Sequence, residues 1–257
     1  MSVDKTEQGA VDCSIENGLA TVTFFHPSHN SLPGKILAKL AQTITELGTQ
    51  EAVKLILLKS AGDRTFCAGA SFDELLAIDN PENGHRFFMG FANVINAMRK
   101  CPKLIIGRVQ GKAVGGGVGV ASATDFCLAT QYASVKLSEL AVGIGPFVVG
   151  PAVERKIGLS GMSQLAIDAS SWQSAEWAQS KGLYAEVFES AEAMDAYIQS
   201  FTEKLLSYNP EALCDLKQAI WEGTEHWDEL LSNRAHISGK LVLSDFTKSF
   251  IQKFKNK

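Results

Sequence analysis

The sequence predicts an α/β fold in which parallel strands are covered by helices on both faces and are followed by a helical C-terminal region. Three observations lead to this prediction. Segments with helical and strand-like spacing of apolar residues alternate along the chain, small-residue turns follow two apolar strands, and no strand pattern occurs after residue 191. With 257 residues, 46% of them hydrophobic, the chain can bury one substantial core.

The first predicted element is a β-hairpin. Apolar residues alternate over residues 11–15 and 20–24, and Asn17-Gly18 between them is typical of a tight hairpin turn. After Pro33, apolar residues recur at helical spacing up to Leu47, and the continuous apolar run at 55–58 predicts a buried strand. The pattern then repeats as a helix at 87–98, a strand at 104–109, a glycine-rich turn, a helix and a strand at 126–129.

The C-terminal part has a different character. Pro210 and Gly223 separate three or four helical stretches there. We therefore divide the chain into an α/β core, residues 1–190, and a helical oligomerisation region, residues 191–257. The last stretch carries apolar residues at helical spacing, namely Phe246, Phe250, Ile251 and Phe254. This stripe predicts packing onto the core or onto a neighbouring subunit.

Composition argues against several classes of protein. The 24 basic and 28 acidic residues nearly cancel without a basic cluster, so we expect no nucleic-acid partner. The N-terminus lacks an apolar signal core and the apolar runs are too short to cross a bilayer, so we expect a cytoplasmic protein without a membrane partner. The five cysteines and five histidines show no metal-ligand spacing, which predicts free thiols and no metal site.

Two turns rich in small residues, at 66–71 and 111–117, are candidates for chemistry. Both follow predicted parallel strands, where α/β sheets commonly place their ligand sites. The second leads into a helix start whose N–H groups and dipole favour negative charge. It matches neither the dinucleotide-binding motif nor the P-loop, so we predict a site where two backbone donors meet one oxygen.

Several segments stand in the order and spacing of motifs from one known family. They are the turn Ala68-Gly69-Ala70, the triple glycine at 115–117, Asp125, the segment at 137–143, the early Pro27 and Asn30, and residues 175–182. On this basis the chain is identified as a member of the crotonase (enoyl-CoA hydratase/isomerase) superfamily. The resemblance covers about residues 11–190 by motifs and the remainder by helical pattern only.

The resemblance implies a crotonase-like spiral of ββα units with a helical C-terminal trimerisation region, assembled as a homotrimer or a dimer of trimers. It also implies an acyl-CoA substrate, no separate cofactor, and an oxyanion hole formed by the N–H groups of Ala70 and Gly116. Neighbouring positions of the two turns are then expected to contact the substrate, namely Ala68, Gly69, Ser71, Gly115 and Gly117.

The carboxylates distinguish this chain within the family. Hydratases of the family carry two glutamates; here the second is Glu139, whereas the first position is Gly119. One carboxylate can move a proton between two carbons of an enolate, as the family's Δ3,Δ2-enoyl-CoA isomerases do. Apolar neighbours predict a raised pKa for Glu139. Ser138, Asp73 and a backbone carbonyl remain as alternatives for holding a water molecule.

The leading interpretation is an enoyl-CoA isomerase or hydratase with Glu139 as its one catalytic glutamate. The alternatives are hydration of a branched, methylglutaconyl-CoA-like thioester, decarboxylation of an acyl-CoA, and a catalytically silent acyl-CoA-binding subunit. Where the family often has a lysine for the coenzyme A phosphates, this chain has Asp73, and Lys253 of an adjacent subunit is a candidate replacement. Cys67 fits a turn residue better than a nucleophile, and Asp125 is expected to fix a loop or cap backbone groups.

Overall fold

The computed structural model describes residues 9–255 and contains two sheets. The larger sheet has the order β1-β2-β3-β5-β7-β9, with β1 (Ala10–Glu16) antiparallel to β2 (Leu19–Phe25). Its other strands run parallel to their neighbours: β3 (Leu55–Ser60), β5 (Leu104–Val109), β7 (Phe126–Thr130) and β9 (Glu186–Phe188). The smaller parallel sheet contains β4 (Thr65–Cys67), β6 (Lys112–Val114) and β8 (Val135–Lys136).

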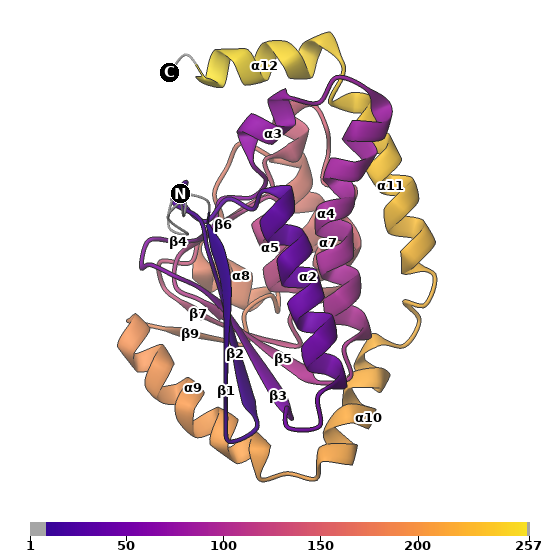
Figure 1. Cartoon of the computed structure of the whole chain (residues 1–257). Helices are drawn as coiled ribbons and strands as arrows, with labels where there is room; N and C mark the ends of the chain where they lie inside the picture. The colour runs from indigo at the N-terminus through magenta and orange to yellow at the C-terminus, as the bar shows by residue number, and fades with distance from the viewer. Residues whose placement is uncertain (1–8, 256–257) are drawn as a thin grey trace, which may run out of the picture.

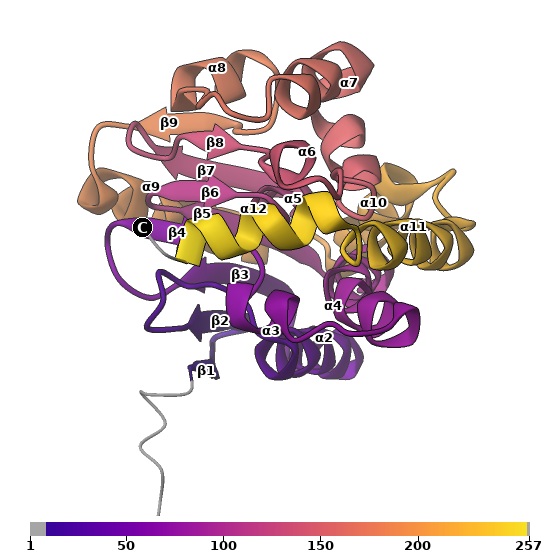
Figure 2. The same ribbon diagram turned by 90° about the horizontal axis from the view of Figure 1, so that it is seen from above.

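The chain winds through these sheets in repeating ββα units. A strand of the large sheet is followed by a strand of the small sheet and then by helix, first as β3-β4 with α3 (Phe72–Leu76) and α4 (Pro81–Lys100). The next units are β5-β6 with α5 (Gly116–Ser122), and β7-β8 with α6 (Glu139–Val142) and α7 (Gly150–Ile167). This arrangement, which can be followed in Figures 1 and 2 together, confirms the predicted spiral.

The continuous apolar runs of the central strands follow from burial on both faces. On β3, Ile56 and Leu58 belong to the core shared with α2 (Gly34–Thr49) and α4, whereas Leu55 and Leu57 belong to a second cluster. That cluster includes residues of α9 (Ala191–Leu206) and α10 (Pro210–Trp221). Figure 1 shows these two pairs of helices on opposite sides of the large sheet.

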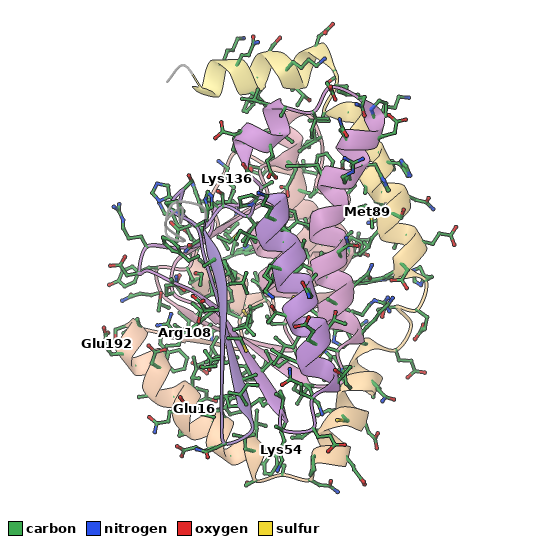
Figure 3. All side chains as sticks on the ribbon, in the orientation of Figure 1. Glu16, Lys54, Met89, Arg108, Lys136 and Glu192 are labelled. Atoms are coloured by element: carbon green, nitrogen blue, oxygen red, sulfur yellow. The ribbon has the colours of Figure 1, made fainter. Side chains whose placement is uncertain are left out.

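Polar contacts also tie the C-terminal helices to the sheet. Arg108 of β5, labelled in Figure 3, donates to Asp195 Oδ2 of α9 at 2.8 Å. Asp125 accepts hydrogen bonds from the Ile105 N–H at 2.7 Å and from Lys217 Nζ of α10 at 2.8 Å. Asp125 therefore caps a backbone group, as predicted, and also anchors α10.

The last two helices approach the cavity described below. Helix α11 (Trp227–Leu241) packs along α4, where a Cβ built at Gly84 would lie 2.6 Å from the carbonyl oxygen of Gly239. Helix α12 (Asp245–Lys255) contacts α3 and α6. It lies across the top of the molecule in Figure 1 and is seen from above in Figure 2. Ile251 is buried against the core and Phe250 is partly buried, but Phe246 is 64% exposed. The side chain of Phe254 lies outside the described part.

The structure adds elements that the sequence did not predict. They are the short strands of the small sheet, β9, the long helix α7, and the short helices α3, α6 and α8 (Ala175–Ser180). Over residues 9–255, no helix combines the length and hydropathy needed to span a bilayer. No group of three or more side chains with metal-binding atoms comes together in the same range.

Candidate active site

A cavity of about 660 Å³, part of it open to solvent, lies where the three strands of the small sheet end. The segment after β4 contributes Ala68, Gly69 and Ala70, the segment after β6 contributes Gly115 and Gly116, and the segment after β8 contributes Ser138 and Glu139. Because all three strands are parallel, their carboxyl ends bring these distant segments to one place.

The two turns touch backbone to backbone. A Cβ built at Gly69 would lie 3.0 Å from the Val114 carbonyl oxygen and 3.7 Å from the Gly116 nitrogen, and Gly69 has a φ of +90°. Within residues 9–255, the N–H groups of Ala70 and Gly116 have no hydrogen-bond acceptor. Both residues line the cavity, so both N–H groups are available to an oxygen atom of a ligand.

Gly116 is a glycine because of Phe91. A Cβ built at Gly116 would lie 2.2 Å from Cε1 of the Phe91 ring, which also forms part of the cavity wall. Phe91 comes from α4, as do Phe87 and Phe88 of the same wall. These three phenylalanines read as ordinary core residues in the sequence, because their helical spacing does not reveal what they face.

Glu139 begins α6 and faces Gly115. A Cβ built at Gly115 would lie 3.1 Å from Glu139 Oε1, so the carboxyl group packs directly against the backbone of the second turn. Its Oε2 atom is buried and has no hydrogen-bond partner among the described residues. This burial raises the pKa of Glu139 to about 7, despite the lowering effect of its own backbone N–H.

The surroundings of Glu139 are apolar. Among the described residues that line the cavity, it is the only Asp, Glu, His, Lys or Arg. The cavity is also lined by Val142, Ile144 and Phe147, which follow Glu139 in the sequence. Here a carboxyl group with a pKa near neutrality can both accept and donate a proton.

Position 119 has no space for a second carboxylate. Gly119 is buried in α5, and a Cβ built there would lie 2.5 Å from Val149 Cγ1. Val149 lies immediately before α7 and lines the cavity. Of the side chains considered for holding water, Ser138 lines the cavity and Asp73 does not.

Not every residue predicted to contact substrate lies at the cavity. Ala68, Gly69 and Gly115 line it. Ser71 instead accepts a hydrogen bond from the Glu74 N–H and caps α3, while Gly117 packs beneath the first turn, where a Cβ would lie 2.6 Å from the Cys67 carbonyl oxygen. Lys253 is exposed on α12 and does not line the cavity within its own chain.

Cys67 has the properties of a structural turn residue. It is fully buried, and burial raises the pKa of its thiol to about 12. The Gly69 N–H donates to its sulfur at 3.4 Å. A thiol of this kind is protonated at neutral pH and is a poor nucleophile.

Known proteins are similar to this chain over half or more of its length. A family model described as enoyl-CoA hydratase/isomerase matches residues 14–254. An ethylmalonyl-CoA decarboxylase of Xenopus tropicalis is 30% identical over 54% of this chain and 46% of its own length, so the match spans less than half of that relative. A probable enoyl-CoA hydratase of Bacillus subtilis is 27% identical over 96% of both chains.

Solved structures with the same fold cover nearly the whole chain. An enoyl-CoA hydratase from Bacillus halodurans superposes with a TM-score of 0.87 at 19% identity, covering 95% of this chain and 99% of its own. An enoyl-CoA hydratase from Mycobacterium avium subsp. paratuberculosis superposes with a TM-score of 0.84 at 25% identity, covering 96% and 95%. At such low identity, the first of these likenesses concerns the fold alone.

Proposed function

This chain belongs to the enoyl-CoA hydratase/isomerase family, and from that premise we propose that it moves a proton at a carbon of an acyl-CoA thioester, with Glu139 as the acid/base. The observation that carries the proposal is the buried Glu139 carboxyl, which packs against Gly115 beside two available backbone donors. Coenzyme A is part of the thioester substrate, and we propose no separate cofactor.

The two donors would stabilise the charge that develops during the reaction. When a proton or a carboxyl group leaves the carbon beside the thioester carbonyl, negative charge moves onto the carbonyl oxygen. Hydrogen bonds from the N–H groups of Ala70 and Gly116 would then strengthen, and such a donor is worth about 2.7–4 kcal/mol in the transition state.

The cavity wall at Val149, behind which Gly119 lies, favours reactions that add no water. A water molecule that attacks an enoyl group needs a polar group to hold it, and Val149 offers none at this wall. Isomerisation needs only that Glu139 remove a proton from one carbon and return it to another. Hydration, including that of a branched enoyl-CoA, would need Ser138 or a backbone carbonyl to position the water.

Decarboxylation of a malonyl-type thioester is the second candidate, favoured by relatives named ethylmalonyl-CoA decarboxylase. The carbon–carbon bond would break, carbon dioxide would leave, and the electron pair would pass to the thioester oxygen. Protonated Glu139 would then give its proton to the carbon. Within residues 9–255, no cation lines the cavity to stabilise the substrate carboxylate in the ground state, which also favours loss of that group.

The pH dependence of kcat/KM should separate these two candidates, because burial raises the pKa of Glu139 to about 7. Isomerisation begins with ionised Glu139, so kcat/KM should fall about tenfold per unit as pH decreases below 7. Decarboxylation requires protonated Glu139, which delivers its proton to the carbon, so kcat/KM should fall about tenfold per unit as pH increases above 7. A flat profile from pH 6 to 8 would contradict the assignment of Glu139.

The substrate is identified by a panel of thioesters. Gain of the conjugated enoyl absorbance from a 3-enoyl-CoA would report isomerisation, and its loss from a 2-enoyl-CoA would report hydration. Release of carbon dioxide from an alkylmalonyl-CoA would report decarboxylation. A chain that binds coenzyme A but neither turns over any thioester nor exchanges its α-proton with solvent deuterium would instead be a catalytically silent subunit.

We also propose that the protein assembles as a homotrimer or a dimer of trimers. Large apolar residues remain exposed on the single chain, including Leu159 at 68%, Ile167 at 76% and Phe246 at 64%. Analytical ultracentrifugation at micromolar concentration should therefore detect a trimer or hexamer, and removal of the residues after Asp245 should weaken that assembly. A monomer of the intact chain would contradict the proposal and would leave Lys253 without a route to a neighbouring cavity.

A further inference from the structure

A second cavity lies between the end of α5, the middle of α7 and the end of α10. Ser122, Asp125, Arg155, Lys156 and Trp221 contribute to its lining. None of these residues lines the cavity that contains Glu139. The two cavities therefore have different walls, although α5 runs from Gly116 at one to Ser122 at the other.

The carboxylate of Asp125 is fully engaged. Lys217 Nζ donates to both of its oxygens at 2.8 Å, Trp221 Nε1 donates at 2.7 Å, and the Ile105 N–H donates at 2.7 Å. The Lys217 and Asp125 side chains are 1% and 3% exposed, so this is a buried ion pair. Because the Asp125 carboxylate already balances the charge of Lys217, it has little capacity left to balance another positive charge.

Two further cations are left without a carboxylate. Lys156 Nζ donates to the backbone oxygen of Asp125 at 2.9 Å, and the Arg155 guanidinium lies 5.4 Å from the centre of the Trp221 ring. Neither side chain has an ion-pair partner within residues 9–255. Burial lowers the pKa of Lys156, and the charges of Lys217 and Arg155 lower it further against the opposing effects of Cys127 and Asp125. A nearby anion would relieve this repulsion.

Ser122 supplies a hydrogen-bond donor at the same place. It is 1% exposed, and its Oγ is buried without a partner among the described residues. A buried hydroxyl without a hydrogen bond is unfavourable, because it loses its contact with water and gains no other partner. The other hydroxyl of this lining, Thr124 Oγ1, already donates to the Ala121 carbonyl oxygen.

From these contacts we infer that the second cavity binds the phosphate group of a small ligand through Lys156, Arg155 and Ser122. A phosphate accepts hydrogen bonds from ammonium, guanidinium and hydroxyl groups at once. The group can come from free phosphate or from coenzyme A, whose nucleotide carries phosphates.

Isothermal titration calorimetry of the full chain with potassium phosphate, at an ionic strength held constant with potassium chloride, tests the inference. Saturable binding is expected, and Lys156→Gln should weaken it by about tenfold or more. Lys35→Gln, which changes an exposed lysine of α2, is the matched control and should bind as the unsubstituted protein does. Alternatively, Arg155 and Lys156 of α7 only offset the negative C-terminal end of the α5 dipole. In that case phosphate will give no binding heat beyond that of chloride, and the inference fails.

Ser122→Ala separates binding from folding. Because the Ser122 hydroxyl has no partner, the variant should melt no lower than the unsubstituted protein in phosphate-free buffer, yet lose about tenfold in phosphate affinity. A lower melting midpoint with unchanged phosphate affinity would overturn the role of Ser122, and unchanged affinity in both variants would overturn the site. A titration in saturating coenzyme A identifies the source: unchanged phosphate binding indicates free phosphate, and abolished binding indicates a phosphate of the coenzyme.

Discussion

Glu139→Gln is expected to lower turnover by about two to four orders of magnitude while leaving acyl-CoA binding nearly unchanged. Glutamine keeps the shape of the side chain and its contact with Gly115, but it cannot accept or deliver the proton. The backbone donors of Ala70 and Gly116 remain in place, which preserves binding of the thioester oxygen. The measurements are kcat on the preferred thioester and the dissociation constant of an unreactive acyl-CoA analogue.

The control for this variant is Glu51→Gln, because Glu51 is exposed and lies outside the cavity lining. It should retain full turnover. Exchange of the substrate α-proton with solvent deuterium should disappear in Glu139→Gln together with turnover. If the variant keeps both, another group transfers the proton and Glu139 is only a wall residue.

The sequence predicted those parts of the fold that are determined by burial on both faces. Strands β3 and β5 were predictable because their apolar residues alternate between two apolar clusters, which gives each strand a continuous apolar run. Strands β4, β6 and β8 were not, because two or three residues carry no periodicity and only their pairing in the small sheet defines them.

The candidate site was predictable in its backbone and in its carboxylate, but not in its walls. The motif order pointed to Ala70, Gly116 and Glu139, and the structure brings all three to one cavity. Ser238 reaches the same cavity from α11, more than 90 residues along the chain from Glu139. No local pattern could reveal that contact, because it depends on how α11 packs along α4.

The neighbours of a glycine could also not be predicted. The family resemblance assigned a role to the Gly116 N–H, but only the structure shows that the Phe91 ring occupies the space that a side chain at position 116 would need. Likewise, Gly117 is required beneath the first turn instead of at the substrate. In both cases a small residue was correctly singled out, but the group that demands it comes from a distant segment.

Gly119→Glu alone is expected to destabilise the protein by several kcal/mol without creating hydration. A Cβ at this position would lie 2.5 Å from Val149 Cγ1, so the new side chain must displace Val149. It would also place a carboxylate against an apolar wall without a partner. Urea unfolding should show the loss of stability, and the conjugated enoyl absorbance of a 2-enoyl-CoA should remain unchanged.

The double variant Gly119→Glu/Val149→Gly provides the room that the single variant lacks. With the valine side chain removed, the new glutamate can enter the space at the cavity wall and hold a water molecule opposite an enoyl group, while Glu139 supplies the proton. We therefore expect the double variant to recover stability relative to Gly119→Glu and to gain measurable hydration of a 2-enoyl-CoA. Val149→Gly alone is the control, since it opens the wall without adding a carboxylate and should not hydrate. Efficient hydration by the unsubstituted protein would contradict the argument, because the apolar wall at Val149 would then be no barrier and Ser138 or a backbone carbonyl would have to hold the water.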